Sequence, residues 1–468
     1  MTLRRFQYGD FLPDQPLTLS GGRNAVPMAK GWAPVKGMSA LTPALAGILG
    51  GAAYVGSDGT AALLSGTATN LYRYSGTAWA SVLGSLSASV WRFDQFGDNV
   101  ICVNGSAPVS FDLAGGTAAA LGGSPPVSDL VATVRQQVFL AGDPAARNTL
   151  SISSYNNSAG WTDGVDQALT VPFPSGGDIM GLCGGETGLI LQKRSVKRAT
   201  YTGDATVWQF DEISKDIGCM AKGSVVQAGQ LVFFLSEQGF KLCDRTQVVP
   251  IGEEKVDRTF FARYSRSQID NITAAVDPRS TTVYWAMPGN PGQIWPYNWT
   301  LEKWGLPIEV PLALVFDGFT ANTSLDALDA LYPSGLDSIP YSLDAPIFAG
   351  GNPLFIVADN AGVLNTLSGD NLAAQFILSP DEPEPGRRVR IRGARPVSDA
   401  VEGTVTIDAR ARAGDPHSSV TSGAMRDNGR VPLRANGRHI GVEHDIPEGA
   451  AWSYALGLEL AFEAEGAR

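Results

Sequence analysis

Charged side chains are scarce in this chain of 468 residues: Asp, Glu, Lys and Arg supply 17% of it, whereas hydrophobic residues supply 44%. This composition excludes a disordered chain, which combines low hydrophobicity with high charge. It also excludes a coiled coil or a helical repeat array, because both are rich in Ala, Glu, Lys, Leu and Arg. The 54 glycines exceed the usual share and indicate many tight turns. A large globular protein of short strands is therefore expected.

Basic residues are absent from one long segment. Between Trp304 and Gly386 there are 11 acids and no Lys or Arg. Residues 386–468 hold 12 Arg and 11 acids, a net charge of +1, which leaves 23 bases and 35 acids, or −12, for residues 1–385. Tight DNA binding through counterion release needs a concentrated basic face. With a net charge of −11, the chain does not fit that class of protein.

Cysteine and histidine are also rare. The four cysteines show no C-x-x-C spacing, so we expect buried, reduced thiols at Cys102, Cys183, Cys219 and Cys243. The three histidines, His417, His439 and His444, all lie near the C-terminus. In a strand, His439 and His444 point to opposite faces, which argues against shared metal ligation. No metal site is predicted.

Motifs for catalysis or cofactor binding are missing. No Ser has Gly at both −2 and +2, which excludes a nucleophile elbow, and there is no P-loop, dinucleotide-binding glycine motif or H-E-x-x-H. The turn Ser154–Trp161 lacks the aspartate of a sialidase-type Asp box. The sequence thus predicts a protein that is not an enzyme and has no cofactor. Paired carboxylates of a glycan-cleaving propeller stay open, because acids are plentiful.

Long apolar runs are absent as well. Arg4 and Arg5 are not followed by the apolar stretch of a signal peptide. Pro43 and several glycines interrupt the longest uncharged stretch, Gly37–Ser57, which therefore predicts a loop and a strand and no membrane-spanning segment. We expect synthesis and folding in a reducing cytoplasm.

Short apolar runs recur every 38 to 52 residues. Their anchors are Ala53, Val100, Val138, Leu189, Leu231 and Val283, and a further run, Leu354–Val357, follows an insertion. A propeller blade of four short strands occupies roughly 40–50 residues. We therefore predict an all-β chain: an extended arm (residues 1–45) followed by an irregular β-propeller of six or seven blades (residues 46–385). Within the propeller, Glu253–Tyr264 predicts one helix, since Val256, Phe260 and Tyr264 share a face.

The last 83 residues, 386–468, show clean alternation of polar and apolar residues. Arg388, Arg390 and Arg392 alternate with Val389 and Ile391. Period-two patterning indicates sheets with one solvated and one buried face. A C-terminal antiparallel β-sandwich is predicted, joined to the propeller by a linker at 381–386.

Two charge clusters are candidate contact sites. A basic patch of Lys193, Arg194, Lys197 and Arg198 is either a solvated blade edge or a contact for phosphate or a partner. An acidic insertion at about 316–350 contains Asp326, Asp329, Asp337 and Asp344. Its spacing does not match a calcium-binding loop. We expect it to project from a blade.

Segments spread along nearly the whole chain are similar to a known family. They are Tyr8–Pro16, Asn24–Pro27, Gly31–Pro34, Asp216–Ser224, Phe234–Phe240, Ile251–Val256, Ala275–Pro278, the insertion with its repeated Leu-Asp pairs, Arg387–Pro396 and Trp452–Arg468. With these segments, the chain resembles the tail nozzle or hub (tail tube) proteins of short-tailed bacteriophages, the podophages.

The resemblance implies a structural protein of the virion tail, assembled in the host cytoplasm. It implies a homo-hexameric ring that extends the portal–adaptor channel, with the head-to-tail adaptor protein and tail fibres or tailspikes as partners. Double-stranded DNA would pass through the lumen without sequence-specific binding, and an acidic wall suits this because it repels phosphate. The aspartates of the insertion would line the channel or dock a fibre. Arg388, Arg390 and Arg392 would pair with acids of a neighbouring subunit or of the adaptor.

Two other functions stay open from the sequence. A carbohydrate-binding or glycan-cleaving propeller would carry carboxylates and aromatic side chains at one mouth of its axis. A monomeric scaffold propeller that binds peptides is the third possibility.

Overall fold

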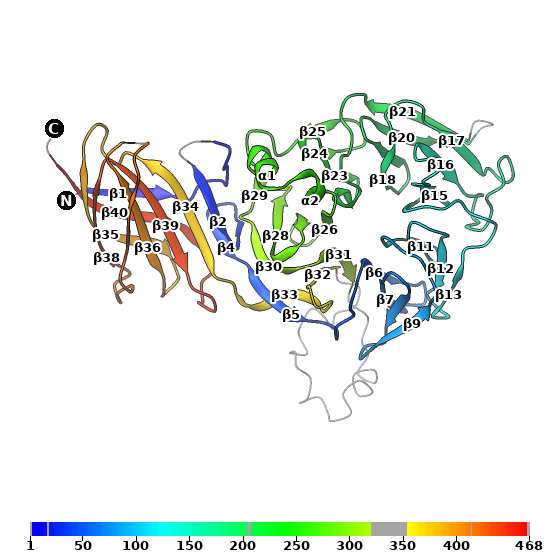
Figure 1. Ribbon diagram of the computed structural model, residues 1–468, viewed down its shortest axis with the longest axis horizontal. Coiled ribbons are helices and arrows are strands. Elements are labelled where there is room, and N and C mark those ends of the chain that lie inside the picture. Colours follow the sequence, from blue (N-terminus) through cyan, green and yellow to red (C-terminus); the bar gives the residue numbers. More distant parts are fainter. Residues whose placement is uncertain (1, 16–17, 204–206, 320–352, 413, 466–468) are drawn as a thin grey trace.

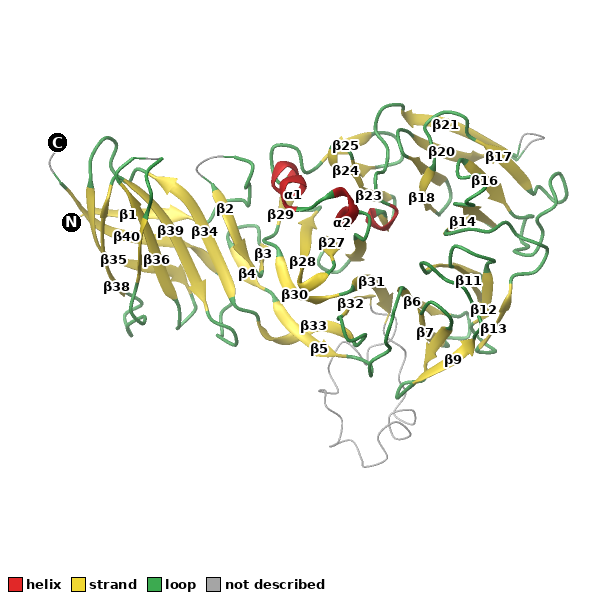
Figure 2. Cartoon of the chain, viewed as in Figure 1, coloured by secondary structure: helices red, strands yellow, loops and turns green. Residues whose placement is uncertain are grey.

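The computed structural model describes residues 2–15, 18–203, 207–319, 353–412 and 414–465, and β-strands dominate its regular structure (Figure 2). Seven antiparallel sheets form a ring, and two more form a sandwich beside it (Figure 1). This confirms the predicted all-β fold of a propeller followed by a sandwich, with seven blades. Both ends of the chain lie at the sandwich.

Six of the seven blades are built from strands that follow one another in the chain. The first three consist of β6 (Gly50–Val55), β7 (Ala61–Gly66), β8 (Leu71–Tyr74) and β9 (Trp79–Leu83); β10 (Arg92–Phe96), β11 (Asn99–Val103), β12 (Val109–Asp112) and β13 (Thr117–Ala120); and β14 (Leu130–Val134), β15 (Gln137–Ala141), β16 (Thr149–Ile152) and β17 (Leu169–Pro172). The next three consist of β18 (Ile179–Cys183), β19 (Gly188–Gln192), β20 (Val196–Tyr201) and β21 (Trp208–Ser214); β22 (Val226–Ala228), β23 (Leu231–Ser236), β24 (Gly239–Cys243) and β25 (Val248–Pro250); and β26 (Thr273–Asp277), β27 (Thr282–Met287), β28 (Gly289–Asn298) and β29 (Lys303–Trp304), with β30 (Ile308–Leu312) paired to β28.

The recurring apolar runs of the sequence have a simple physical cause. Their anchors Val100, Val138, Leu189, Leu231 and Val283 lie in β11, β15, β19, β23 and β27, the second strand of five successive blades. Neighbouring blades cover both faces of such a strand, so both sets of its alternating side chains are buried. All five residues of β15 and of β19, for example, are buried. A strand buried on both faces reads as a continuous apolar run.

The seventh blade closes the ring with a strand from the start of the chain. It consists of β31 (Leu314–Phe319), β32 (Pro353–Ala358), β33 (Leu364–Asn371) and the N-terminal strand β5 (Lys36–Ala40). Ala40 pairs with Asn365 and Met38 with Leu367, antiparallel. The outer strand of the last blade therefore comes from just before the first blade, so backbone hydrogen bonds join the two ends of the ring.

The sandwich draws on both ends of the chain. One sheet has the order β3 (Ala25–Pro27), β4 (Trp32–Pro34), β40 (Ala455–Ala464), β35 (Val389–Ser398) and β38 (Val431–Gly437), with β1 (Thr2–Gln7) paired to β40. The other has the order β2 (Leu19–Arg23), β34 (Ala374–Asp381), β39 (His439–Ile446), β36 (Thr404–Arg410) and β37 (Ser418–Thr421). Residues 1–45, expected as an extended arm, thus supply β1–β4 to the sandwich and β5 to the propeller. The strand β34 precedes the expected sandwich boundary at residue 386.

Two short helices lie together on the propeller (Figure 2). The helix expected at 253–264 is α1 (Asp257–Arg263), followed by α2 (Arg266–Ile269), and a 3-10 turn, η1, covers Lys222–Ser224. The start of α1 lies later than expected because residues 253–256 form a turn. The predicted apolar face is present, since Val256 and Phe260 are fully buried.

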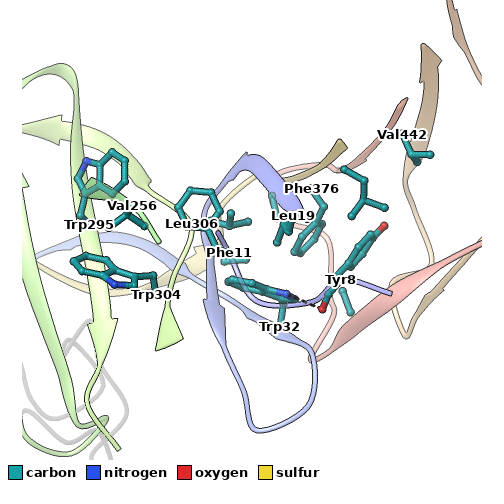
Figure 3. Packing of buried hydrophobic residues seen from close by; sticks show 14 of the residues in the cluster. Tyr8, Phe11, Leu19, Trp32, Val256, Trp295, Trp304, Leu306, Phe376 and Val442 are labelled. Atoms are coloured by element: carbon teal, nitrogen blue, oxygen red, sulfur yellow. Dashed lines mark hydrogen bonds between the residues drawn. The ribbon is translucent and has the colours of Figure 1, made fainter. Parts of the chain in front are cut away.

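One hydrophobic core runs from the propeller into the sandwich. The cluster includes Trp295 and Trp304 of the sixth blade and Phe376 and Val442 of the sandwich, with Leu306 and Phe11 between them (Figure 3). Tyr8 packs on Phe376 at the sandwich side. Phe11 and Trp32 of the N-terminal segment belong to it too, and the indole Nε1 of Trp32 donates to the Tyr8 carbonyl oxygen at 3.3 Å. The N-terminal segment therefore packs at the joint between the two parts of the molecule.

Candidate functional sites

A cavity of about 710 Å³ lies on the axis of the propeller. Residues of all seven innermost strands or of the turns beside them line it: β6, β10, β14, β18, β22, β26 and β31. The isolated bridge between Val134 and Gly185 is parallel, as expected for neighbouring innermost strands that run in the same direction along the axis. The two mouths of the cavity thus collect residues from opposite ends of these strands.

Two carboxylates and a tyrosine lie toward the C-terminal ends of the innermost strands. They are Asp94 of β10, Asp317 of β31 and Tyr54 of β6. The Asp94 carboxylate accepts hydrogen bonds from the backbone N–H of Gln95, at 2.9 Å, and of Thr133. Burial raises the pKa of Asp94 to about 6 despite these bonds. The Asp317 side chain is open to the cavity, but the surrounding protein raises its pKa to about 6 as well. Burial, together with the charges of Asp94 and Asp317, raises the pKa of the Tyr54 hydroxyl.

The other end of the cavity holds an ion pair between blades. Lys222 Nζ lies 2.5 Å from the Asp129 carboxylate. Lys222 lies just before β22 and Asp129 just before β14, so this ion pair connects the fifth blade to the third. Arg92, at the start of β10, donates from Nη1 to the Asp129 carbonyl oxygen at 2.8 Å. Asp129 therefore ties together three blades around the axis.

Three aromatic residues also belong to the lining of the axial cavity. Trp91, Phe93 and Phe316 line the same cavity, and Trp91 stacks on Phe93 with ring centroids 5.8 Å apart. Such a lining can accept hydrogen bonds from hydroxyl groups and can hold a proton near pH 6. Sequence analysis did not single out Asp94, Asp317 or Tyr54. Each is one polar residue in a strand of ordinary appearance, and only the ring of blades brings them together.

The basic patch makes most of its contacts within its own blade. Lys193 Nζ lies 2.8 Å from Asp178, Lys197 Nζ lies 2.9 Å from Glu212, and Arg198 Nη2 lies 3.1 Å from Asp211. Lys197 is buried, and Arg194 is exposed. Three of the four bases thus have an acidic partner within 4.0 Å. This arrangement stabilises the fourth blade and leaves little net charge for an external partner.

The arginines at the start of β35 and just before it face solvent. Arg388, Arg390 and Arg392 are exposed, whereas Val389 and Ile391 between them are buried. Arg392 Nη2 lies 2.7 Å from Glu463 on the neighbouring strand β40, and this hydrogen bond is the main cause of the lowered pKa of Glu463. The three guanidinium groups therefore form one outward face of the sandwich. The candidate aspartates of the insertion, Asp326, Asp329, Asp337 and Asp344, lie outside the described residues.

The cysteines and histidines are placed as the sequence indicated. All four cysteines are free and buried. Burial raises the pKa of Cys183 to about 12 and that of Cys219 to about 11. His439 is partly exposed near Glu382. His444 points to the other face of the same strand, β39, and is fully buried. Across the described part of the chain, no group of three or more His, Cys, Asp or Glu residues is arranged to hold a metal ion.

Among the helices of the described ranges, none is both long enough and apolar enough to span a bilayer. No protein-family model matches the chain, and no curated protein matches its sequence. Solved structures do match. The structure of U3-55K has 10% identity and a TM-score of 0.39, covering 62% of this chain and 89% of that one.

Two further solved structures show a likeness of the same order. The crystal structure of the RRP9 WD40 repeats has 11% identity and a TM-score of 0.40, covering 69% of this chain and 98% of that one. A chain of the nidogen/laminin complex has 11% identity and a TM-score of 0.30, covering 44% of this chain and 81% of that one. These likenesses carry no inference about activity or partners.

Proposed function

We propose that this chain is a structural subunit of a phage tail nozzle, or hub, that assembles into a ring around the DNA exit channel. It acts there as a wall, without catalysis, beside the head-to-tail adaptor and the tail fibres or spikes. The observation that carries the proposal is the joint between propeller and sandwich. Several of the segments that resemble nozzle proteins lie at that joint or in the blades next to it, whereas Arg387–Pro396 lies largely in β35 of the sandwich.

The first resembling segment, Tyr8–Pro16, spans the joint. Tyr8 stacks on Phe376 of the sandwich with ring centroids 4.6 Å apart, and Phe11 packs against Trp295 of the sixth blade at 6.4 Å. The Asp14 carboxylate accepts hydrogen bonds from the backbone N–H groups of Arg258 and Thr259, at 2.8 and 2.9 Å. An acceptor at this position satisfies N–H groups that the first turn of α1 leaves unpaired. One short segment therefore fixes the sandwich, the sixth blade and α1 relative to one another.

Three more resembling segments meet at two tryptophans of the sixth blade. Trp285 Nε1 donates to the Ser224 carbonyl oxygen at 3.0 Å, and Trp304 Nε1 donates to the Ile251 carbonyl oxygen at 2.9 Å. Phe240 packs against both rings, with centroid distances of 4.6 and 4.9 Å. Ser224, Phe240 and Ile251 each belong to a different resembling segment. These three segments thus belong to a single packing unit in the molecule.

A tube wall needs subunits that transmit force without bending at a linker. Here the propeller and the sandwich share one apolar core and a doubly anchored N-terminal segment, since β1 and β2 pair in the sandwich and β5 closes the propeller. A net charge of −11 also suits a wall past which DNA slides, because like charges repel the phosphates. These features support the proposal together with the resemblance.

Purified full-length protein tests the proposal by native mass spectrometry and negative-stain electron microscopy. We expect a closed ring with a central opening, six-fold in class averages. Antibodies raised against the chain should label the tails of the phage particles that carry it. A chain that stays monomeric by itself and gives no label on tails would contradict the proposal.

A glycan-binding propeller is the second candidate, and the axial cavity favours it. Asp94, Asp317 and Tyr54, with aromatic residues in the same lining, provide the carboxylates and aromatics expected for sugar recognition at a propeller axis. A glycan array probed with the wild type and with the double variant Asp94→Asn, Asp317→Asn tests it, with Asp427→Asn on the sandwich as the control. Binding lost only in the double variant would support this candidate, and a simple glycosidase assay would show whether cleavage follows.

A further inference from the structure

A groove on the sandwich concentrates arginines that sequence analysis did not group. Its cavity measures about 690 Å³ and lies where the edge strands β37 and β38 of the two sheets come together. The charged residues of its lining are Arg392, Arg395, Arg426, Arg430, Arg434 and Glu459. We call this feature the arginine groove. With five arginines and one acid, its lining carries a net charge of +4 in a chain of net charge −11.

A β-bulge brings one of these arginines to the groove. Along β35 the pairing with β40 shifts between Ile391 and Gly393, so Ile391 pairs with Phe462 but Gly393 pairs with Ala461. A bulge changes which residues share a face of the strand. Arg395 consequently lines the same groove as Arg392, although three positions separate them. Strict alternation would have placed the two side chains on opposite faces.

Most charges of the groove have no acidic partner among the described residues. Arg392 pairs with Glu463 at 2.7 Å. For Arg395, Arg426, Arg430 and Arg434, no carboxylate of the described residues lies within 4.0 Å. The basic patch of the fourth blade differs in this respect, because three of its four bases are paired. Clustered guanidinium groups without counter-charges repel one another and bind carboxylates strongly.

The lining of the groove also contains apolar residues. Leu433 is buried there, and Val420, Ala461 and Leu3 also contribute to the lining. The Leu3 side chain is 65% exposed, the second most exposed of the large hydrophobic residues in the described part of the chain. A binding partner that suits both the apolar residues and the arginines of this lining carries apolar groups as well as carboxylates. A polyanion such as DNA offers only the charge, and the net negative charge of the chain opposes it.

The chain itself contains such an occupant. Residues 320–352 hold four acids and no base, and each aspartate follows a leucine: Leu325-Asp326, Leu328-Asp329, Leu336-Asp337 and Leu343-Asp344. A Leu-Asp pair places an apolar group and a carboxylate side by side. We propose that the arginine groove binds the acidic segment 320–352 of a second copy of this chain.

The positions of the two partners favour binding between copies. Phe319 and Pro353, which flank the acidic segment, pair with each other in the seventh blade. The groove lies at β35 and β38, at the end of the sandwich farthest from the propeller (Figure 1). A segment rooted in the propeller of one copy and a groove on the outer sandwich of the next form a head-to-tail contact. Such contacts between copies close into rings when their rotation allows it. The inference deepens the proposed nozzle function and names the contact that would hold its ring.

A synthetic peptide of residues 320–352 tests the inference by titration against the full-length protein. We expect saturable binding that weakens with salt, because the contact is ionic. The variant Arg395→Glu, Arg430→Glu, Arg434→Glu should bind at least about tenfold more weakly, since reversed charges repel the aspartates. Arg194→Glu, on the propeller, should bind as the wild type does. A peptide with its four aspartates replaced by asparagine should not bind.

Other outcomes would overturn the inference. The same peptide is also titrated against the full-length variant Asp326→Asn, Asp329→Asn, Asp337→Asn, Asp344→Asn. The segment of this variant lacks the aspartates, so it should not fill the arginine groove and the groove stays free for the peptide. If the peptide binds this variant and never the wild type, while the wild type stays monomeric, each groove holds its own segment. A short DNA duplex that binds the groove while the peptide does not would identify a nucleic-acid site instead. A ring that forms while the peptide binds neither the wild type nor this variant would overturn only this inference. Peptide binding by a chain that forms no ring and gives no label on phage tails would overturn only the nozzle function.

Discussion

The hydroxyl of Tyr8 lies 2.8 Å from Nδ1 of His444, a contact between residues 436 positions apart in the chain. Phe376 stacks on Tyr8 and lies beside His444, at centroid distances of 4.6 and 6.0 Å. His444 is fully buried, and its Nε2 has no hydrogen-bond partner among the described residues. The N-terminal segment thus depends on a neutral imidazole inside the sandwich.

The burial of His444 predicts acid sensitivity. Burial lowers the pKa of His444 to about 4, from 6.5, so the unfolded chain takes up this proton at a higher pH than the folded chain does. The free energy of unfolding should therefore fall as the pH drops from 7 toward 4. Between pH 7 and pH 5 this one group should cost about 2 kcal/mol. Urea unfolding at a series of pH values measures the effect.

His444→Gln separates this effect from those of other groups. Asp94, Asp257 and Asp317 have pKa values raised to about 6, so their protonation acts in the opposite direction over the same range. The variant keeps these carboxylates and removes the imidazole, so its loss of stability toward pH 5 should be smaller than that of the wild type. His417→Gln, at an exposed site, should keep the wild-type profile. Equal profiles for His444→Gln and the wild type would contradict the prediction.

A second prediction concerns the packing unit on which several of the resembling segments converge. Phe240 is fully buried and packs against Phe260, Trp285 and Trp304 with centroid distances of 4.6 to 4.9 Å. Phe240→Ala should lower the free energy of unfolding by about 3–5 kcal/mol, because it removes a ring and leaves a cavity. Chemical denaturation measures the loss. Val249→Ala, at a site 38% exposed on the next strand, is the matched control and should change little.

Thiol reactivity gives a third prediction. All four cysteines are buried, and burial raises the pKa of each thiol above its ordinary value. The thiolate is the reactive form, so the native protein should react with a thiol reagent at neutral pH only slowly. The four thiols should all react once the chain is unfolded in denaturant. A fast-reacting thiol in the native protein would show that one of the covering blades opens.

Much of the fold could be predicted because burial leaves a local trace in the sequence. Val138 and Leu140 lie in a strand covered on both faces, which gives a continuous apolar run. Val405 and Ile407 lie in a strand covered on one face, which gives alternation. Both patterns depend only on near neighbours along the chain. They were sufficient to predict the propeller and the sandwich and to place them in the right order.

The pairing of distant segments could not be predicted in this way. Thr2 pairs with Phe462 and Ala40 with Asn365, and nothing in the sequence near Thr2 or Ala40 encodes these partners. The segment 1–45 was therefore expected to be an extended arm. The candidate sites also depend on contacts between segments that are distant in the sequence. Asp94 and Asp317 meet at the axis only in the closed ring, and Arg395 reaches the arginine groove only through the bulge in β35.

The last prediction separates assembly from stability at the face of Arg388, Arg390 and Arg392. The three side chains are exposed, and the one ion pair that they form with described residues, Arg392 with Glu463, is a surface pair. Exposed ion pairs contribute at most about 1 kcal/mol, so Arg388→Glu, Arg390→Glu, Arg392→Glu should unfold close to the wild type.

The same triple variant should lose its ring in native mass spectrometry, because three reversed charges would face the acids of the neighbouring subunit or adaptor. Arg194→Glu reverses one exposed arginine of the fourth blade, away from this face, and should keep the ring. A ring that survives the reversal of all three charges would exclude this face from the interface. Because Arg392 also lines the arginine groove, the groove is tested separately with Arg395→Glu, Arg430→Glu, Arg434→Glu, which leaves Arg388, Arg390 and Arg392 unchanged.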